Sequence, residues 1–208
     1  VTHSGENLTM TETSFKLRLV TLEPKEISAF IVVSQKLLNN WETAGAFTGR
    51  ILSQAMVAQE DMDFLRGDGI NKSLGLINSP AAIVYPRAGA NAISFADVYG
   101  MAARLLRRGG SPCWLASQSI LPQLCNMTDA GGRAVWTGSA MEGLRGAAAP
   151  LPPSLLGFPV VFSDRLPALG SKGDLVLADL EYYIIKDGSG PAIASSEHVY
   201  FLQNRVVF

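Results

Sequence analysis

The chain has 208 residues, of which 48% are hydrophobic and 17% charged, and its formal net charge is −1. This length and hydrophobic content are enough to bury a core in one or two globular domains. The near-zero charge excludes the basic field that draws proteins onto nucleic acids or anionic membranes, and no apolar run reaches the roughly 18 residues of a membrane-spanning helix. We therefore expect a globular protein with no membrane partner.

The N-terminal region contains an arm, a predicted hairpin and a short predicted helix. Residues 1–14 are polar and rich in threonine and serine, which is typical of an exposed arm. Residues 15–22 alternate apolar and polar side chains, and residues 27–33 are β-branched and aromatic, so the two segments predict a β-hairpin with a turn at 23–26. Ser34 is then expected to cap a short helix that ends near residue 40.

A long helix is predicted from about residue 43 to residue 66. Its apolar residues recur at steps of three and four, which places them on one stripe of a helix: Phe47, Ile51, Ala55, Ala58, Met62 and Leu65. Gly67 and Gly69 are expected to end it, because glycine tolerates the positive φ that is common just past a helix end. At about 1.5 Å per residue the helix would be about 36 Å long, so we expect it to act as a strut.

A second domain is predicted after a loop. Residues 81–85 form a candidate strand, and residues 86–91 form a loop that marks a candidate boundary. Ser94 predicts the start of a helix with Asp97 near its positive end. Near the negative end of that helix lie three arginines, Arg104, Arg107 and Arg108.

The remaining predicted elements are short and are separated by Pro, Gly and Asp. They are strands at residues 114–116, 160–162, 174–177, 182–185 and 204–208, a helix at 120–125 and a loop at 129–150. The last strand has neither a partner nor a turn beside it in the sequence, which we interpret as a sign of a fragment. An α+β domain is the fold expected from this pattern.

Several segments resemble, in the same order, parts of tailed-phage major capsid proteins, which have the Hong Kong 97-type fold. They are residues 27–38, the long helix with its continuation through residues 65–69 and 74–77, and residues 114–117, 155–164 and 173–180. The resemblance covers most of residues 15–208. It implies an α+β fold with a long spine helix, a peripheral β-region and an axial α+β domain.

The resemblance also implies a division of the chain. Residues 1–14 would be the remnant of an extended arm that reaches over a neighbouring subunit, and residues 15–90 a peripheral domain that contains the spine helix. Residues 91–195 would be the axial domain, and residues 196–208 the truncated start of a return strand to the peripheral domain.

The function that the resemblance implies is structural. The protein would be a phage or prophage major capsid protein that self-assembles into pentamers and hexamers of an icosahedral shell around double-stranded DNA. It would be made in the bacterial cytoplasm and end in the virion, with a scaffolding segment, a portal and a maturation protease as further partners. Some relatives cross-link covalently through lysine, asparagine and glutamate, but no catalytic residue is assigned to this sequence.

An acidic cluster near the end of the long helix is the candidate for contacts between subunits. Glu60, Asp61 and Asp63 lie in the final turns, where carboxylates oppose the helix dipole, and Arg66 follows them. A solvated face or a cation site are alternative interpretations. Our hypothesis is that an arginine of a neighbouring subunit offsets these acids, so that glutamine at positions 60 and 63 would weaken association more than folding.

Other candidate chemistry receives a simpler explanation from the sequence. The glycines at 67 and 69 follow a helix, whereas a phosphate loop precedes one. The arginines near 104–108 oppose a helix dipole, which we favour over contact with DNA phosphates. Three serines lack a nucleophile motif: Ser34, Ser117 and Ser139. Three acids fit turns and strand edges: Asp174, Asp179 and Glu181. The cysteines and histidines do not have the spacing of a metal site or a disulfide framework: Cys113, Cys125, His3 and His198. We therefore expect no cofactor and no metal.

Two alternative functions remain open at this stage. An encapsulin-like nanocompartment shares the fold but encloses cargo enzymes, and neighbouring genes would distinguish it from a phage capsid. A small ligand-binding or hydrolytic α+β enzyme is the more remote alternative, because the sequence contains no convergent set of polar residues.

Overall fold

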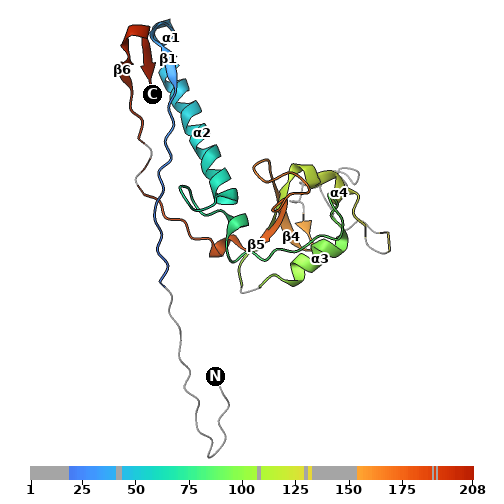
Figure 1. The fold of residues 1–208 in the computed structure, drawn as a ribbon. Coiled ribbons are helices and arrows are strands. Elements are labelled where there is room, and N and C mark those ends of the chain that lie inside the picture. The colour runs from blue at the N-terminus through green and yellow to red at the C-terminus, as the bar shows by residue number, and fades with distance from the viewer. Residues whose placement is uncertain are drawn as a thin grey trace, which may run out of the picture.

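The computed structural model describes residues 19–40, 44–106, 109–128, 131–132, 154–188, 190 and 192–208. A long helix, α2, Ala44–Arg66, has a small sheet at one end and a mixed helix and sheet domain at the other (Figure 1). The predicted arm at 1–14 and, apart from residues 131–132, the predicted loop at 129–150 lie outside the described residues. No helix in the described part of the chain is long and apolar enough to cross a membrane.

The predicted spine helix is confirmed as α2, Ala44–Arg66. The backbone N–H of Gly67 donates to the carbonyl of Asp63 at 2.8 Å, which completes the last turn. The side-chain amide of Asn78 then donates to the carbonyls of Arg66 and Gly67 at 2.9 and 3.1 Å, so helix-end carbonyls that lack an intrahelical partner are satisfied. A Cβ at Gly67 would overlap the carbonyl oxygen of Ser73, so this position requires glycine because of close packing.

The small sheet is antiparallel and has the strand order β1-β7-β6. It consists of β1, Val32–Ser34, β7, Arg205–Val207, and β6, Ser196–Tyr200. Val33 lies opposite Val206, and both side chains are buried. The short helix α1, Gln35–Asn40, follows β1 as predicted, and the hydroxyl of Ser34 accepts the N–H of Leu37 at 3.3 Å.

The predicted hairpin of residues 15–22 with 27–33 is wrong. In the described part of these segments, residues 19–31 are extended without forming a strand, and β1 begins only at Val32. Its partner is β7. The final strand, expected to lack a partner, lies at the centre of the sheet, between β1 and β6. These pairings join opposite ends of the chain, so a local pattern of alternation gives no information about them.

The domain at the other end of α2 is built on a four-stranded sheet with the order β3-β4-β2-β5. Its strands are β3, Ser154–Leu155, β4, Phe158–Ser163, β2, Cys113–Ser117, and β5, Leu175–Ala178. β2 is parallel to β4 and antiparallel to β5. This topology differs from a simple meander, and it places β2 at the centre of the domain.

Two helices cover one face of this sheet and close the main core. They are α3, Phe95–Ala103, and α4, Leu121–Cys125, and both match predicted helices. Val98 and Leu124 bring the helices against Trp114 of β2, and all three side chains are fully buried. The indole N–H of Trp114 donates to the carbonyl of Leu155 at 2.9 Å, so the buried polar atom of this residue is satisfied.

The opposite face of β2 packs against the end of the spine. Leu115 forms a second, smaller cluster with Ile77, just after α2, and with Leu166. Leu65 of α2 packs against this cluster from the helix. Since neighbouring residues of a strand point to opposite faces, Trp114 supports the domain core while Leu115 joins the domain to the spine.

Two further predicted strands are wrong. Residues 81–85 contain no strand, and residues 182–185 begin at the end of a 3-10 helix, Leu180–Tyr182, and continue without strand pairing. Both segments are β-branched or aromatic, but each runs between the spine and the sheet domain. Composition alone therefore predicted the extended backbone and not the absence of a neighbour to pair with.

Candidate subunit interface

The apolar stripe of α2 is covered over only part of its length. At its C-terminal end, Leu65 is half-buried against the cluster of Ile77, Leu115 and Leu166. Towards the N-terminal end the stripe is uncovered, with Ile51 at 41% exposure, and on a neighbouring face in the middle of the helix Val57 is 56% exposed. A stripe of this kind normally faces a protein core, so the uncovered part of α2 is the best candidate for a contact surface.

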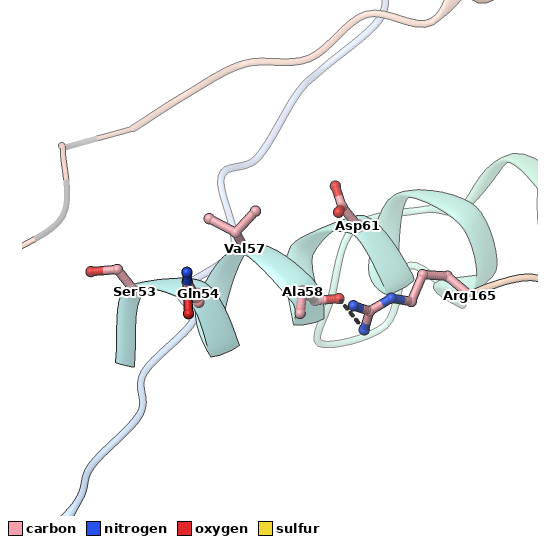
Figure 2. A pocket seen from close by; sticks show the side chains of 6 residues that line it. All are labelled: Ser53, Gln54, Val57, Ala58, Asp61 and Arg165. Carbon is pink, nitrogen blue, oxygen red and sulfur yellow. Dashed lines mark hydrogen bonds between the residues drawn. The ribbon is translucent and has the colours of Figure 1, made fainter. Parts of the chain in front are cut away.

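A shallow hollow of about 300 Å³ lies on this surface (Figure 2). It is lined by Ser53, Gln54, Val57, Ala58 and Asp61 of α2 and by Arg165 from the loop after β4. In Figure 2 the side chain of Arg165 reaches towards α2 from the sheet domain. The hollow therefore contains both an apolar wall and two groups of opposite charge.

Arg165 connects the sheet domain to the middle of α2. One of its Nη atoms donates to the carbonyl of Ala58 at 3.5 Å, and its Nε lies 3.2 Å from a carboxylate oxygen of the exposed Asp164. A cation beside the acidic end of α2 is favourable because carboxylates in the last turns oppose the helix dipole. Arg165 was not predicted from the sequence, since no local pattern indicates that this loop residue contacts Ala58, 107 positions earlier.

The four predicted contact residues occupy different environments. Asp61 lines the first hollow, whereas Asp63 and Arg66 line a second hollow of about 280 Å³ with Gln59, Met62 and Lys72. Asp63 is only 7% exposed, and its carboxylate accepts the side-chain N–H of Gln59 at 3.0 Å. Glu60 is half-buried and lines neither hollow. The structure thus brings the four residues to one end of α2 but not into one site.

The other residues considered for chemistry have structural contacts. Arg104 lies over the ring of Tyr85, 4.6 Å from its centroid. Ser117 and Ser119 share a hydrogen bond of 3.0 Å, and Asp179 accepts the N–H of Glu181 at 3.2 Å at the start of a 3-10 helix. The remaining candidates His3, Arg107, Arg108 and Ser139 lie outside the described residues.

The acidic and sulfur-bearing residues do not form a metal centre in the described part of the chain, which contains no group of three or more potential ligands. Cys113 and Cys125 are free thiols. Burial, together with the nearby charge of Asp179, raises the pKa of the Cys113 thiol, so this thiol stays protonated near neutral pH. His198 lies exposed in β6, away from both cysteines in the sequence.

The comparisons with known proteins decide the family. The sequence model described as the phage capsid family matches residues 1–208. The chain belongs to the phage capsid family. It is a capsid shell protein.

Solved capsid structures share the fold of this capsid protein. The capsid of an empty GTA particle matches with a TM-score of 0.60 and 20% identity over 88% of this chain. The capsid of a native GTA particle matches with a TM-score of 0.56 and 20% identity over 74% of this chain. The capsid protein spans 65% and 56% of the length of those chains. No curated protein matches the sequence. These matches are consistent with the expected Hong Kong 97-type fold.

Proposed function

We propose that this capsid protein assembles with copies of itself, through the uncovered face of α2, into pentamers and hexamers of an icosahedral shell that encloses double-stranded DNA. The observation that carries the proposal is the half-covered stripe of α2. One end of the stripe is buried by the chain's own sheet domain, and Ile51 and Ala55, which are both exposed, continue it towards the other end. Copies arranged in a ring would cover that part.

The elongated part of the molecule supports the same conclusion. The extended segments that lead into β1 and β6 carry large exposed apolar side chains, such as Phe30 before β1 and Ile184 before β6, at 77% and 67% exposure. Phe201 and Leu202 are also exposed, at the turn between β6 and β7. Apolar surface spread over an elongated shape is costly for a monomer and is typical of a protein that buries it between subunits.

Polar contacts are proposed to orient the subunits. The candidate inter-subunit residues remain Glu60, Asp61, Asp63 and Arg66. Their environments rank the expected strength of their contacts. Asp61 is exposed beside Arg165, whereas Asp63 already has Gln59 as a partner. We therefore place the strongest polar contact at Asp61, with a cation of the neighbouring copy, and a weaker one at Asp63.

Expression from the complete coding sequence, followed by negative-stain electron microscopy, tests the proposal. Closed, uniform shells that protect double-stranded DNA from nuclease would support it. Closed shells that contain a cargo protein and no DNA would indicate an encapsulin-like compartment instead. A monodisperse monomer, even with the scaffold and the maturation protease present, would contradict assembly of any kind.

A further inference from the structure

One turn of the sheet domain receives contacts from two other parts of the chain. Residues 170–174 lead into β5, and Gly170 and Gly173 adopt φ of +97° and +90°. A Cβ at Gly173 would lie 2.5 Å from Ile77, and a Cβ at Gly170 would overlap the side chain of Asn91. Residues from both ends of the connection between spine and sheet domain, Ile77 and Asn91, therefore pack against this turn.

The same turn holds a buried ion pair with that connection. One Nη atom of Arg87 donates to both carboxylate oxygens of Asp174, at 2.7 and 2.6 Å. The side chain of Asp174 is 4% exposed, and it also accepts the backbone N–H groups of Gly170 and Leu175, both at 2.9 Å. A buried carboxylate with this many donors holds its partner in a fixed direction, and loss of that partner is costly.

Residues next to Arg87 attach the same segment to α3. The ring of Tyr85 packs closely against Gly100 and lies below the guanidinium of Arg104. The N–H of Ala88 donates to the carboxylate of Asp97 at 3.2 Å. Residues 85–91, which we name the clamp, are thus attached to the sheet domain through Tyr85, Arg87, Ala88 and Asn91.

The segment before the clamp has few attachments. Its start is fixed to the spine, where Asn78 donates to the end of α2. Between these two anchors Ile83 and Val84 are exposed, and Ser79 accepts two turn bonds, from the N–H of Ala82 to its carbonyl and from the N–H of Ala81 to its hydroxyl. Among the described residues, the spine and the sheet domain also meet at the small cluster around Ile77 and at the hydrogen bond from Arg165 to Ala58, and small interfaces allow domains to move.

The connection that leaves the sheet domain after β5 is anchored to the spine. After β5 the hydroxyl of Tyr183 donates to the carbonyl of Leu74 at 2.8 Å, and its ring lies edge-on against Phe64 of α2. The first connection is therefore fixed to the sheet domain, and the second is fixed to the spine.

We propose that residues 79–84 are the hinge between the spine and the sheet domain, and that the Arg87–Asp174 pair locks the clamp so that bending is confined to this hinge. With the lock intact, bending of this connection is limited to six residues. Without it, the flexible segment would extend to about residue 92, and the angle would vary more widely. The consequence for shells rests on the proposed function, whereas the lock itself is a property of the single subunit.

Hydrogen–deuterium exchange on unassembled subunits tests the lock. Arg87→Met is expected to raise exchange at least tenfold in peptides that cover residues 85–92 and to leave peptides of β2 unchanged. Lys72→Gln is the matched control, because it removes an exposed ion pair with Asp68 at 3.9 Å and should change neither region. Wild-type exchange at 85–92 in Arg87→Met, or an equal rise in β2, would overturn the proposal.

Two further measurements keep the result clear. If Arg87→Met does not fold, Arg87→Lys retains the charge with a different donor geometry, and a rise confined to 85–92 is expected again. Electron microscopy of assembled Arg87→Lys should show a broader distribution of shell diameters than wild type, and an equally narrow distribution would contradict the link between the hinge and shell geometry. If wild-type protein forms no shells, the proposed function fails, while the exchange data still decide the lock.

Discussion

Single residues at the start of α3 show how local sequence determines structure. Ser94 and Asp97 form a reciprocal capping box, in which each side chain accepts the backbone N–H of the other residue. Asp97 also accepts the N–H of Ala88 from the clamp. Burial acts to raise the pKa of Asp97, but the hydrogen bonds from Ser94 and Ala88 and the charge of Arg87 outweigh it, so the pKa lies below its ordinary value of 3.8.

Asp97→Asn is expected to lower the free energy of unfolding at neutral pH by about 1–2 kcal/mol, the usual value of a helix cap. A carboxylate whose pKa is lower in the folded state stabilises the fold above its unfolded pKa, and this contribution disappears as the pH falls through the folded pKa. The difference in the free energy of unfolding between wild type and variant should therefore have its full value at pH 6 and shrink below about pH 4. Urea unfolding of unassembled subunits at a series of pH values measures it.

A pH-independent difference would show that the carboxylate charge contributes nothing at this site. Ser53→Ala is a suitable control, because the hydroxyl of Ser53 donates only to the carbonyl of Gly49 on the exposed side of α2. This variant should leave the pH dependence of stability unchanged.

Residue roles that depend on near neighbours were predictable, and roles that depend on distant ones were not. Ser34 and Ser94 were expected as caps, and both accept the N–H three residues later. Arg87 and Arg165 each meet a partner more than 80 positions away, and neither was singled out from the sequence. A cap is defined by its own turn, whereas an ion pair across domains is defined by the fold.

At the scale of elements, α2 shows why the glycines after the helix matter. Gly67→Ala is expected to destabilise the subunit by about 1–3 kcal/mol, because the added methyl would overlap backbone oxygens of Asp63 and Ser73. Gly49→Ala, inside the same helix, is expected to stabilise it by up to about 1 kcal/mol, since alanine favours helix and the methyl would meet only Ile193 at 3.8 Å. Thermal unfolding of unassembled subunits compares the two variants.

The test is whether the two substitutions change the stability of the subunit in opposite directions. Equal effects of the two substitutions would mean that the turn after α2 relaxes freely around an added methyl. The close approach of residues 67 and 73 would then not be needed to end the helix.

Long helices were easier to predict than strands in this chain. The period of the apolar residues defined α2 to within one residue of its start, whereas two of the predicted strands have no partner and the strand pairs of the small sheet join distant segments. A helix satisfies its backbone hydrogen bonds internally, so its own sequence contains most of the information needed to predict it. A strand needs a neighbour, which the local sequence does not specify.

At the scale of the whole molecule, two clusters of unequal size hold the subunit together. The main core lies inside the sheet domain, and the smaller cluster of Ile77, Leu115 and Leu166 joins that domain to the spine. The candidate interface combines residues that the sequence indicated, such as Asp61, with Arg165, which only the fold brings there. An exposed apolar surface along the spine therefore remains for association with other copies.

Val57→Glu tests whether association uses this surface. Val57 is 56% exposed in the middle of α2, so glutamate, which also favours helix, should leave the free energy of unfolding of the isolated subunit within about 0.5 kcal/mol of wild type. In an assembled interface the added carboxylate would replace an apolar contact close to the like charge of Asp61, and its desolvation together with that repulsion costs several kcal/mol per subunit contact and should abolish shells. Val57→Ala, which adds no charge, should still assemble. Sedimentation velocity and electron microscopy distinguish the outcomes, and normal shells from Val57→Glu would move the interface away from this face of α2.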